Sequence, residues 1–280
     1  MGMTILTLVE NTVQKLGLIA EHGLSFLIAV PGGDILFDTG QGFALIANAS
    51  RMEIDLRRIS AIVLSHGHRD HTGALAQVLA VTGGRPVFAH PSAFFRKYSK
   101  KTGELRSIGV PETREVLERG GMQLRTCMKP MEVVHGIMAT GPIPRVTDFE
   151  PIPTHFLTDA LDGSSLVHDV LEDDQALILD QGDNPPIVIL GCGHSGIVNT
   201  LLYAAELAGT KSFSLVIGGT HLIDADETRL EETLDSLRQF KIMRIAPCHC
   251  TGPRGQVALW QRYGAAFLSN TTGDRLECTE

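Results

Sequence analysis

Four side chains that can bind a metal ion lie within six residues, directly after the apolar run 61–64, and they are His66, His68, Asp70 and His71. His66 and His68 are two residues apart, so on an extended segment both side chains project from the same face. Asp70 and His71 follow at a turn into a helix, where the loop can curl back on the same point. Three imidazoles and one carboxylate suit Zn²⁺ or another divalent transition ion.

A metal site needs ligands from more than one loop, and three later histidines also follow apolar runs. The runs are 187–190, 213–217 and 243–246, and the histidines that follow them are His194, His221 and His249. Side chains at the ends of successive strands gather at one edge of a layered α/β fold. We therefore expect His194 and His249 to be metal ligands. For His221 a structural role stays open beside a functional one.

Asp38 ends the apolar run 35–37 and precedes Gly40 in a glycine-rich turn. A carboxylate at this place can orient a ligand imidazole from outside the coordination shell. It can equally form an ordinary Asx turn. Both interpretations stay open.

The five cysteines are an odd number without framework spacing, which favours a reducing compartment. Cys248 and Cys250 flank His249, and thiolates are good zinc ligands, so a structural site with cysteine has to be weighed. On an extended segment the two cysteines share the face opposite His249. We therefore expect His249 and this pair not to share one ion. Cys192 is interpreted as a small buried residue.

The elements that must position these residues are short apolar strands alternating with helical patterns. Strands are predicted over 25–30, 34–37, 61–64, 86–89, 176–179, 187–190, 213–217 and 243–246. Helices are predicted from Thr72 onward and over 196–208, 226–238 and 254–262. A turn at Pro31-Gly32-Gly33 joins the first two strands.

Both halves begin with paired strands and proceed to strand–helix units. This order predicts an α/β fold with two sheets packed together and helices outside. No linker of Gly/Ser or Pro composition separates the halves, so residues 1–280 are predicted to form a single domain. Residues 96–120 are basic and weakly periodic, and we expect them to be a mobile insertion.

Composition narrows the classes of function. The 280 residues carry a net charge of −8, and 43% of them are apolar. The acidic balance disfavours a nucleic-acid partner and the nuclease class. No apolar run reaches the ~18 residues of a membrane span, and the N-terminus lacks a basic region followed by an apolar one. We expect a cytoplasmic protein with a small-molecule substrate and no membrane partner, and a homo-oligomer stays open.

The segment His66-Gly67-His68-Arg69-Asp70-His71 resembles the H-x-H-x-D-H motif of the metallo-β-lactamase superfamily without a gap. The later histidines and Asp38 fall in the order of that superfamily. Further segments resemble one branch, whose proteins are often described as dihydropterin-methyl ribofuranosylaminobenzene-phosphate synthase-like: 22–47, 65–73, 140–145, 173–176, 191–199, 218–222 and 249–252. The resemblance spans nearly the whole chain.

This resemblance implies a four-layer αββα sandwich that holds one or two divalent ions, with Zn first and Mn, Fe or Mg as alternatives. By analogy, one ion is bound by His66, His68 and His194, and a second by Asp70, His71 and His249. The superfamily usually places a bridging Asp where this chain has Gly218-Gly219-Thr220-His221. His221 is the candidate to replace that Asp, as a metal ligand or as a contact to substrate.

The first functional hypothesis is a metal-dependent hydrolase or transferase that acts on a small, phosphorylated or pterin-like molecule through a metal-bound hydroxide. A metal ion lowers the pKa of bound water toward ~7 and polarises the substrate oxygen. Asp70 and His221 are the predicted catalytic residues. Arg145 is the predicted contact to a substrate anion, with Lys97 and Lys100 as weaker candidates. The alternative for these three cations is ordinary surface charge.

The second hypothesis is a metal-binding redox or sensor module without hydrolytic turnover. The cysteines and the missing bridging Asp keep this alternative open. Imidazole and carboxylate ligands also suit a ferrous or diiron site. Turnover of phosphodiesters, and its loss in His68→Ala, would distinguish the enzyme from the module.

Overall fold

The computed structural model describes residues 3–30, 32–160 and 162–278. These residues form two compact units. Unit 1 contains the described residues within 1–128, 152–173 and 271–279, and unit 2 contains those within 129–151 and 174–270. The assignment of residues 1–280 to a single domain stays a prediction.

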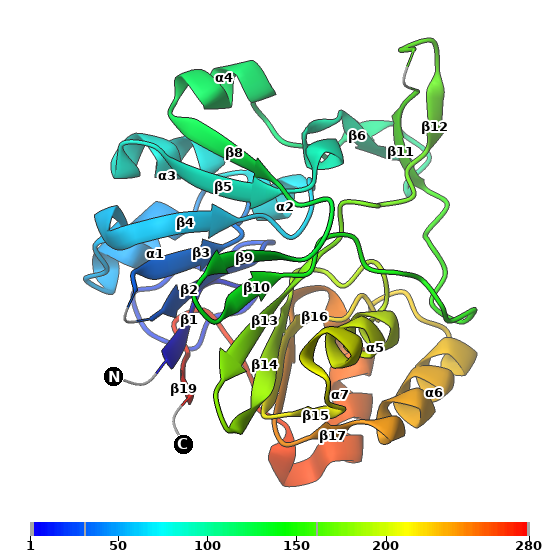
Figure 1. The fold of residues 1–280 in the computed structure, drawn as a ribbon. Helices are drawn as coiled ribbons and strands as arrows, with labels where there is room; N and C mark the ends of the chain where they lie inside the picture. The colour runs from blue at the N-terminus through cyan, green and yellow to red at the C-terminus, as the bar shows by residue number, and fades with distance from the viewer. Residues whose placement is uncertain (1–2, 31, 161, 279–280) are drawn as a thin grey trace. The chain divides into compact units, whose positions relative to one another are not determined.

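Unit 1 is built on a seven-stranded sheet with the order β19-β1-β2-β3-β4-β5-β8 (Figure 1). Its strands are β1 (Met3–Val9), β2 (Ser25–Ala29), β3 (Asp34–Phe37), β4 (Ile59–Val63), β5 (Arg85–Ala89), β8 (Met122–Thr126) and β19 (Arg275–Cys278). β3, β4, β5 and β8 are parallel to one another. Their carboxyl ends therefore meet at one edge of the sheet, where the loop after β4 carries the predicted ligands.

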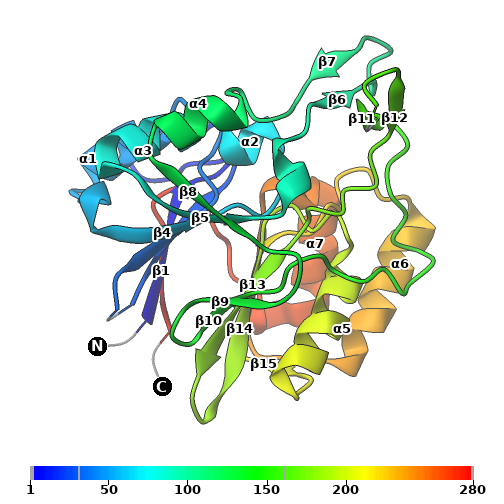
Figure 2. The same ribbon diagram turned by 45° about the horizontal axis from the view of Figure 1, so that its top comes forward.

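Helices cover one face of this sheet (Figure 2). They are α1 (Leu45–Arg51), α3 (Leu75–Thr82) and α4 (Arg114–Arg119). Their apolar side chains join those of the strands in one buried core, to which Leu45, Leu79 and Leu117 contribute. Burial of this face is the main stabilising contribution to unit 1.

A second sheet of unit 1 has four short strands in the order β12-β11-β6-β7. They are β6 (Lys97–Ser99), β7 (Arg106–Ser107), β11 (Phe156–Asp159) and β12 (Leu166–His168). Two of these strands and helix α4 come from residues 96–120. The predicted insertion thus contains regular elements, and its mobility stays a prediction.

Unit 2 is built on a six-stranded sheet with the order β18-β16-β14-β13-β10-β9. Its strands are β9 (Met131–Val134), β10 (Ile137–Ala139), β13 (Ala176–Gln181), β14 (Asn184–Leu190), β16 (Leu215–Gly219) and β18 (Ile245–Cys248). β14, β16 and β18 are parallel. A separate pair is formed by β15 (Ser212–Phe213) and β17 (Lys241–Ile242).

Three helices follow the parallel strands of unit 2: α5 (Ile197–Ala208), α6 (Glu227–Ser236) and α7 (Gly252–Tyr263). Each contributes apolar side chains to a core with the sheet, among them Leu201, Leu230 and Leu259. The loops between each strand and its helix are therefore fixed at both ends. These loops contain His194, His221 and His249.

Most predicted elements agree with the structure, and the α5, β13 and β14 segments match within a few residues. The helix expected from Thr72 onward is wrong at its start. A short helix, α2 (Arg69–Thr72), ends there, and α3 begins at Leu75. Gly73 separates them because the backbone of Gln41 packs against it, with the Gln41 oxygen only 2.1 Å from where a Cβ would lie. The predicted turn includes Pro31, which lies outside the described residues.

Within residues 3–30, 32–160 and 162–278, no helix combines the length and apolar character needed to cross a bilayer.

Candidate metal centre

The H-x-H-x-D-H residues lie where β4 of unit 1 passes through a loop into α2. His68 precedes α2 with an extended backbone, at ψ 148°, whereas Asp70 and His71 lie in the helix. This change of direction brings the imidazoles together. The ring centroid of His66 lies 4.6 Å from that of His68 and 4.3 Å from that of His71. Nε2 of His71 lies 3.7 Å from a carboxylate oxygen of Asp70.

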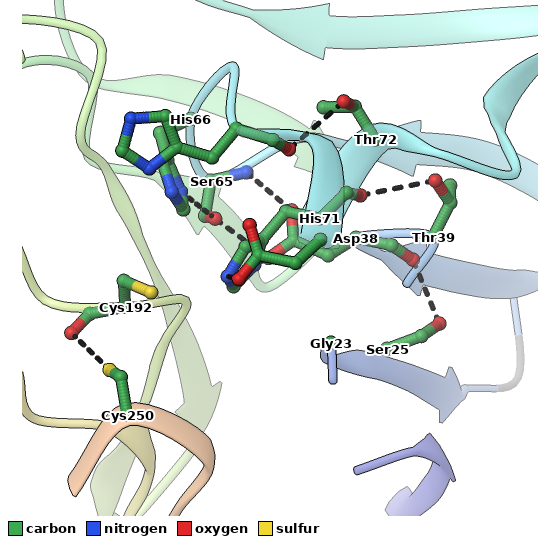
Figure 3. A network of polar contacts seen from close by, with 12 residues as sticks. Gly23, Ser25, Asp38, Thr39, Ser65, His66, His71, Thr72, Cys192 and Cys250 are labelled. Atoms are coloured by element: carbon green, nitrogen blue, oxygen red, sulfur yellow. Dashed lines mark hydrogen bonds and ion pairs between the residues drawn. The ribbon is translucent and has the colours of Figure 1, made fainter. Parts of the chain in front are cut away.

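Asp38, directly after β3, connects two of these imidazoles through a fully buried carboxylate (Figure 3). Its Oδ2 accepts hydrogen bonds from Nδ1 of His71 at 2.7 Å and from the hydroxyl of Ser65 at 2.6 Å. Its Oδ1 accepts one from the Ser65 amide at 2.7 Å. The backbone of Asp38 has φ 60°, a left-handed conformation that Asp tolerates better than most residues.

The same network fixes the tautomers of two histidines. The Ser65 oxygen lies 2.9 Å from Nδ1 of His66. Because the Ser65 proton is donated to Asp38, this oxygen accepts the proton of His66 Nδ1–H. His71 likewise places its Nδ1 proton on Asp38. Both rings therefore present the lone pair of Nε2, the arrangement found in metal-binding histidines.

A buried ion-pair network holds the backbone between His66 and His68. Nζ of Lys97 lies 2.7 Å from Oδ2 of Asp169 and 3.0 Å from Oδ1 of Asp173. The other oxygen of Asp173 accepts the Gly67 amide at 2.7 Å. Burial opposes the charge of Lys97, but the two carboxylates raise its pKa above the ordinary value.

The role predicted for Lys97 is therefore wrong. Its side chain is 2% exposed, so it is not surface charge. Its ammonium is already neutralised by two carboxylates, which makes it unsuited to bind a substrate anion. Lys97 instead stabilises the carboxylate that holds the ligand loop. Lys100 is exposed.

The residue between His66 and His68 is Gly67, and no side chain fits at that position. A Cβ there would lie 2.0 Å from the carbonyl oxygen of Ala93, in the short 3-10 segment Pro91–Phe94. The amide of Arg69 donates to the carbonyl of Ile108 at 2.7 Å. Contacts with segments far along the chain thus fix the backbone of the ligand loop.

Burial keeps two of the imidazoles neutral. The pKa of His66 falls well below its ordinary value because of burial, and the nearby His71 and His68 add to this effect. The pKa of His68 falls to about 3, through burial first and the charge of Lys97 second. Neutral imidazole is the form that binds metal ions. With the carboxylate of Asp70, the donors of unit 1 fit a divalent ion.

In unit 2 the predicted ligands follow three parallel strands: His194 after β14, His221 after β16 and His249 after β18. The ring centroids of His194 and His221 lie 4.4 Å apart. Cys192 is a further possible ligand beside these histidines. Its Sγ lies within 4.8 Å of one imidazole nitrogen of His194 and of one of His249. The sequence pattern did not predict this position for the thiol.

Cys250 forms a further group with Cys192 and His221, whose donor atoms all lie within 4.8 Å of one another. Sγ of Cys250 donates to the carbonyl oxygen of Cys192 at 3.1 Å (Figure 3). Burial acts to raise the pKa of the Cys250 thiol. Hydrogen bonds with the side chains of Cys192 and His221, together with the charges of His249 and His221, outweigh burial and bring the pKa well below its ordinary value.

The extended segment assumed for Cys248, His249 and Cys250 is wrong. β18 ends at Cys248, and a 3-10 turn, His249–Thr251, begins at once. His249 has a left-handed backbone, at φ 52°. The segment is therefore not extended, and the two cysteines do not share a face. Within the described part of the chain, the donor group of Cys250 includes Cys192 and not Cys248.

Arg145, the predicted anion contact, donates from Nη1 to the carbonyl oxygen of His194 at 2.8 Å. Burial lowers the pKa of this guanidinium. Asp174 accepts the amide of Ser195 at 2.7 Å. Two side chains therefore hold the loop that carries His194 by its backbone.

Comparisons with known proteins show the family of the chain. A model of the metallo-beta-lactamase superfamily matches residues 18–249. The chain is 31% identical over 259 residues to a 7,8-dihydropterin-6-methyl-4-(beta-D-ribofuranosyl)-aminobenzene-5'-phosphate synthase of Methanocaldococcus jannaschii, with 89% of this chain and 87% of that protein covered. An uncharacterised protein of the same organism is 32% identical over 256 residues, covering 91% of this chain and 93% of that one.

A solved structure, Tm1679, is described as a metal-dependent hydrolase of the beta-lactamase superfamily. It has a TM-score of 0.85 and 28% identity to this chain, and covers 99% of it and 100% of the other chain. The resemblance found in the sequence and the predicted α/β fold class are confirmed.

Proposed function

This chain belongs to the metallo-β-lactamase superfamily, and from that premise we propose that it is a metal-dependent hydrolase or transferase acting on a small, phosphorylated or pterin-like molecule. Two relatives support this class: one is named as a dihydropterin-related phosphate synthase, and the other is described as a metal-dependent hydrolase. The observation that carries the proposal is the network of Asp38, Ser65, His66 and His71, because it prepares two Nε2 lone pairs for a cation.

We propose the ligands in the order that the superfamily implies: His66, His68 and His194 for one divalent ion, and Asp70, His71 and His249 for a second. Zinc is the first candidate, with Mn, Fe or Mg as alternatives. Such an ion supplies electrophilic polarisation of the substrate and activates water. This assignment rests on the family order of the residues.

The residues of the chain have distinct tasks in this proposal. Asp38 keeps the proton of His71 on Nδ1, and Ser65 does the same for His66. Asp70 binds the cation and orients the attacking water, and its Oδ2 lies 3.3 Å from Nε2 of His22. His221 takes the place of the usual bridging Asp.

Arg145 is proposed to bind the anionic group of the substrate. A guanidinium carries five N–H donors, so its bond to the carbonyl of His194 does not exclude a second partner. A cation that is itself held beside a ligand loop can orient a phosphate next to the reacting centre. The partner is a small molecule rather than a nucleic acid or a membrane, and the proposed compartment is the cytoplasm.

The first test measures metal content and hydrolysis of bis(p-nitrophenyl) phosphate by the full chain. His66→Ala, His68→Ala and His249→Ala should each lower the metal content and abolish turnover, while far-ultraviolet circular dichroism stays unchanged. His168→Ala, at an exposed position of β12, is the control and should keep both properties. Full metal occupancy in the first three variants would rule out the proposed ligands.

A parallel assay uses a dihydropterin with a phosphorylated ribosyl co-substrate and follows formation of the condensed product. Turnover in this assay alone assigns a transferase, and turnover of the phosphodiester assigns a hydrolase. A protein that binds metal stoichiometrically but turns over neither substrate would support the redox or sensor module instead.

A further inference from the structure

Unit 2 contains a donor group that the proposed ligand sets leave unused. We propose that Cys192, His221 and Cys250 form a thiolate–imidazole site for Zn²⁺ or a similarly borderline divalent ion. One donor atom of each residue lies within 4.8 Å of a donor atom of the other two. The side chains are contributed by three different loops, after β14, β16 and β18.

The donor types favour zinc. Two sulfurs and one imidazole nitrogen are a common zinc set, with Zn–S near 2.3 Å and Zn–N near 2.0 Å. At those bond lengths, two donor atoms bound to the same ion lie roughly 3.5–4 Å apart. The three donor atoms here lie within 4.8 Å of one another, so they are close enough to bind one ion after small side-chain movements. A fourth position is left for water or substrate, as in zinc sites that are not purely structural.

Charge balance also favours this ion. The three residues are buried, with Cys192 3%, Cys250 7% and His221 9% exposed. An unbalanced charge is costly at such a site. On binding, each thiol releases its proton to solvent and forms one sulfur–metal bond, so two thiolates neutralise the two positive charges of the ion.

The backbone is built to keep the sulfurs close. A Cβ on Gly219 would lie 2.6 Å from Sγ of Cys250 and 3.1 Å from Cα of Cys192, so any larger residue would push the two loops apart. The amide of Gly219 donates to Gly191 at 2.8 Å and joins the first two loops. His221 is held at φ 49°, a conformation that is costly for a non-glycine residue and that often occurs at functional sites.

This inference goes beyond the proposed function, whose ligand sets contain neither cysteine. It assigns His221 to this thiolate site instead of to the place of the bridging Asp. The site lies within unit 2 and needs no residue of the His66–His71 cluster. The two proposals can therefore fail separately.

The test adds Co²⁺ to the metal-stripped full chain and records the near-ultraviolet absorption of thiolate-to-cobalt charge transfer. Wild type should develop this band. Cys192→Ser and Cys250→Ser should each lose it or bind Co²⁺ at least tenfold more weakly, since even changes outside the coordination shell cost about 10–100-fold in affinity. Cys248→Ser, at a buried neighbouring cysteine of β18, is the matched control and should keep the band.

His68→Ala separates this proposal from the proposed function. The variant should lose turnover and keep the thiolate band. A wild type that turns over substrate but shows no band would overturn the thiolate site alone. A band that disappears in Cys192→Ser and survives in Cys250→Ser would place the sulfur in the group with His194 and overturn the three-residue site.

A second measurement uses only the wild type, so its result does not depend on whether the variants fold. X-ray absorption at the zinc edge of the zinc-loaded wild type should show sulfur scatterers at about 2.3 Å. Only nitrogen and oxygen scatterers, near 2.0–2.2 Å, would overturn the proposal.

Discussion

The two units hold their metal donors by different physical means. In unit 1 one short loop supplies three imidazoles and a carboxylate, and buried polar side chains orient them: Asp38, Ser65, Asp173 and Lys97. In unit 2 the donors follow three separate strands, and the loops are held by glycine contacts and bonds to their backbone. In unit 1 buried side chains orient the donor rings themselves, whereas in unit 2 the contacts hold the main chain of the loops that carry the donors.

The largest effect should follow from breaking the charge network of unit 1. Lys97→Met leaves two buried carboxylates unpaired and should reduce the free energy of unfolding by about 3–5 kcal/mol. Urea denaturation measures this change. Lys100→Met, at the exposed position directly after β6, should change it by less than about 0.5 kcal/mol. Equal effects of both variants would show that the network is not important for unit 1.

A smaller effect is expected when the orienting carboxylate is neutralised. Asp38→Asn preserves the shape and tolerates the left-handed backbone, but it removes an acceptor that His71 and Ser65 share. Metal affinity should fall about 10–100-fold. Competition with a chromophoric chelator measures it, with Asp180→Asn, an exposed residue of unit 2, as control. Unchanged affinity in Asp38→Asn would contradict the orienting role.

Acid should destabilise the metal-free protein through the imidazoles of unit 1. The pKa of His68 is about 3 in the folded chain, against an ordinary value of 6.5. Below pH 6.5 the unfolded chain therefore binds a proton that the folded chain excludes, so stability is present above this pH and is lost as the pH falls. For this histidine alone, the free energy of unfolding should fall by about 1.4 kcal/mol for each pH unit below 6.5.

Unfolding midpoints between pH 6.5 and 5 measure this dependence with metal removed. Unfolding of His68→Asn should take up one proton fewer than unfolding of the wild type, so the stability of the variant should depend less steeply on pH. Identical slopes for the variant and wild type would show that the imidazole is not kept neutral by burial.

The smallest effect should follow from removing a hydrogen bond between a side chain and the backbone of unit 2. Arg145→Ala removes one hydrogen bond to the carbonyl of His194 and should cost about 1 kcal/mol of stability. If Arg145 also binds the substrate, KM for phosphorylated substrates should rise far more than KM for neutral ones, with a lesser change in kcat. Equal changes for both substrate types would leave Arg145 only its role in holding the loop.

Local patterns predicted most strands within a few residues, because apolar periodicity is a local property. The contacts between distant residues could not be predicted this way. Lys97 meets Asp173 across 76 positions, and Cys250 meets Cys192 across 58. A lysine followed by a short polar stretch gives no sign of a buried partner.

Backbone conformation explains the other differences. Cys248 and Cys250 would share a face on an extended chain, but the left-handed residue His249 turns the chain immediately after β18. The single helix expected after Thr72 assumed that helical spacing continues, but Gly73 packs against Gln41 and interrupts it. The break at Gly73 depends on a contact with a distant segment, which the local pattern does not contain.

Gly67 determines how the ligand loop can be re-engineered. Because the carbonyl of Ala93 occupies the space where a side chain would begin, random mutagenesis at position 67 alone should return glycine almost exclusively. A library aimed at new specificity should keep this position constant and vary Pro91–Phe94 together with the exposed neighbours of the loop. The first substitutions for altered specificity therefore fall in Pro91–Phe94, a segment that contains no proposed metal ligand.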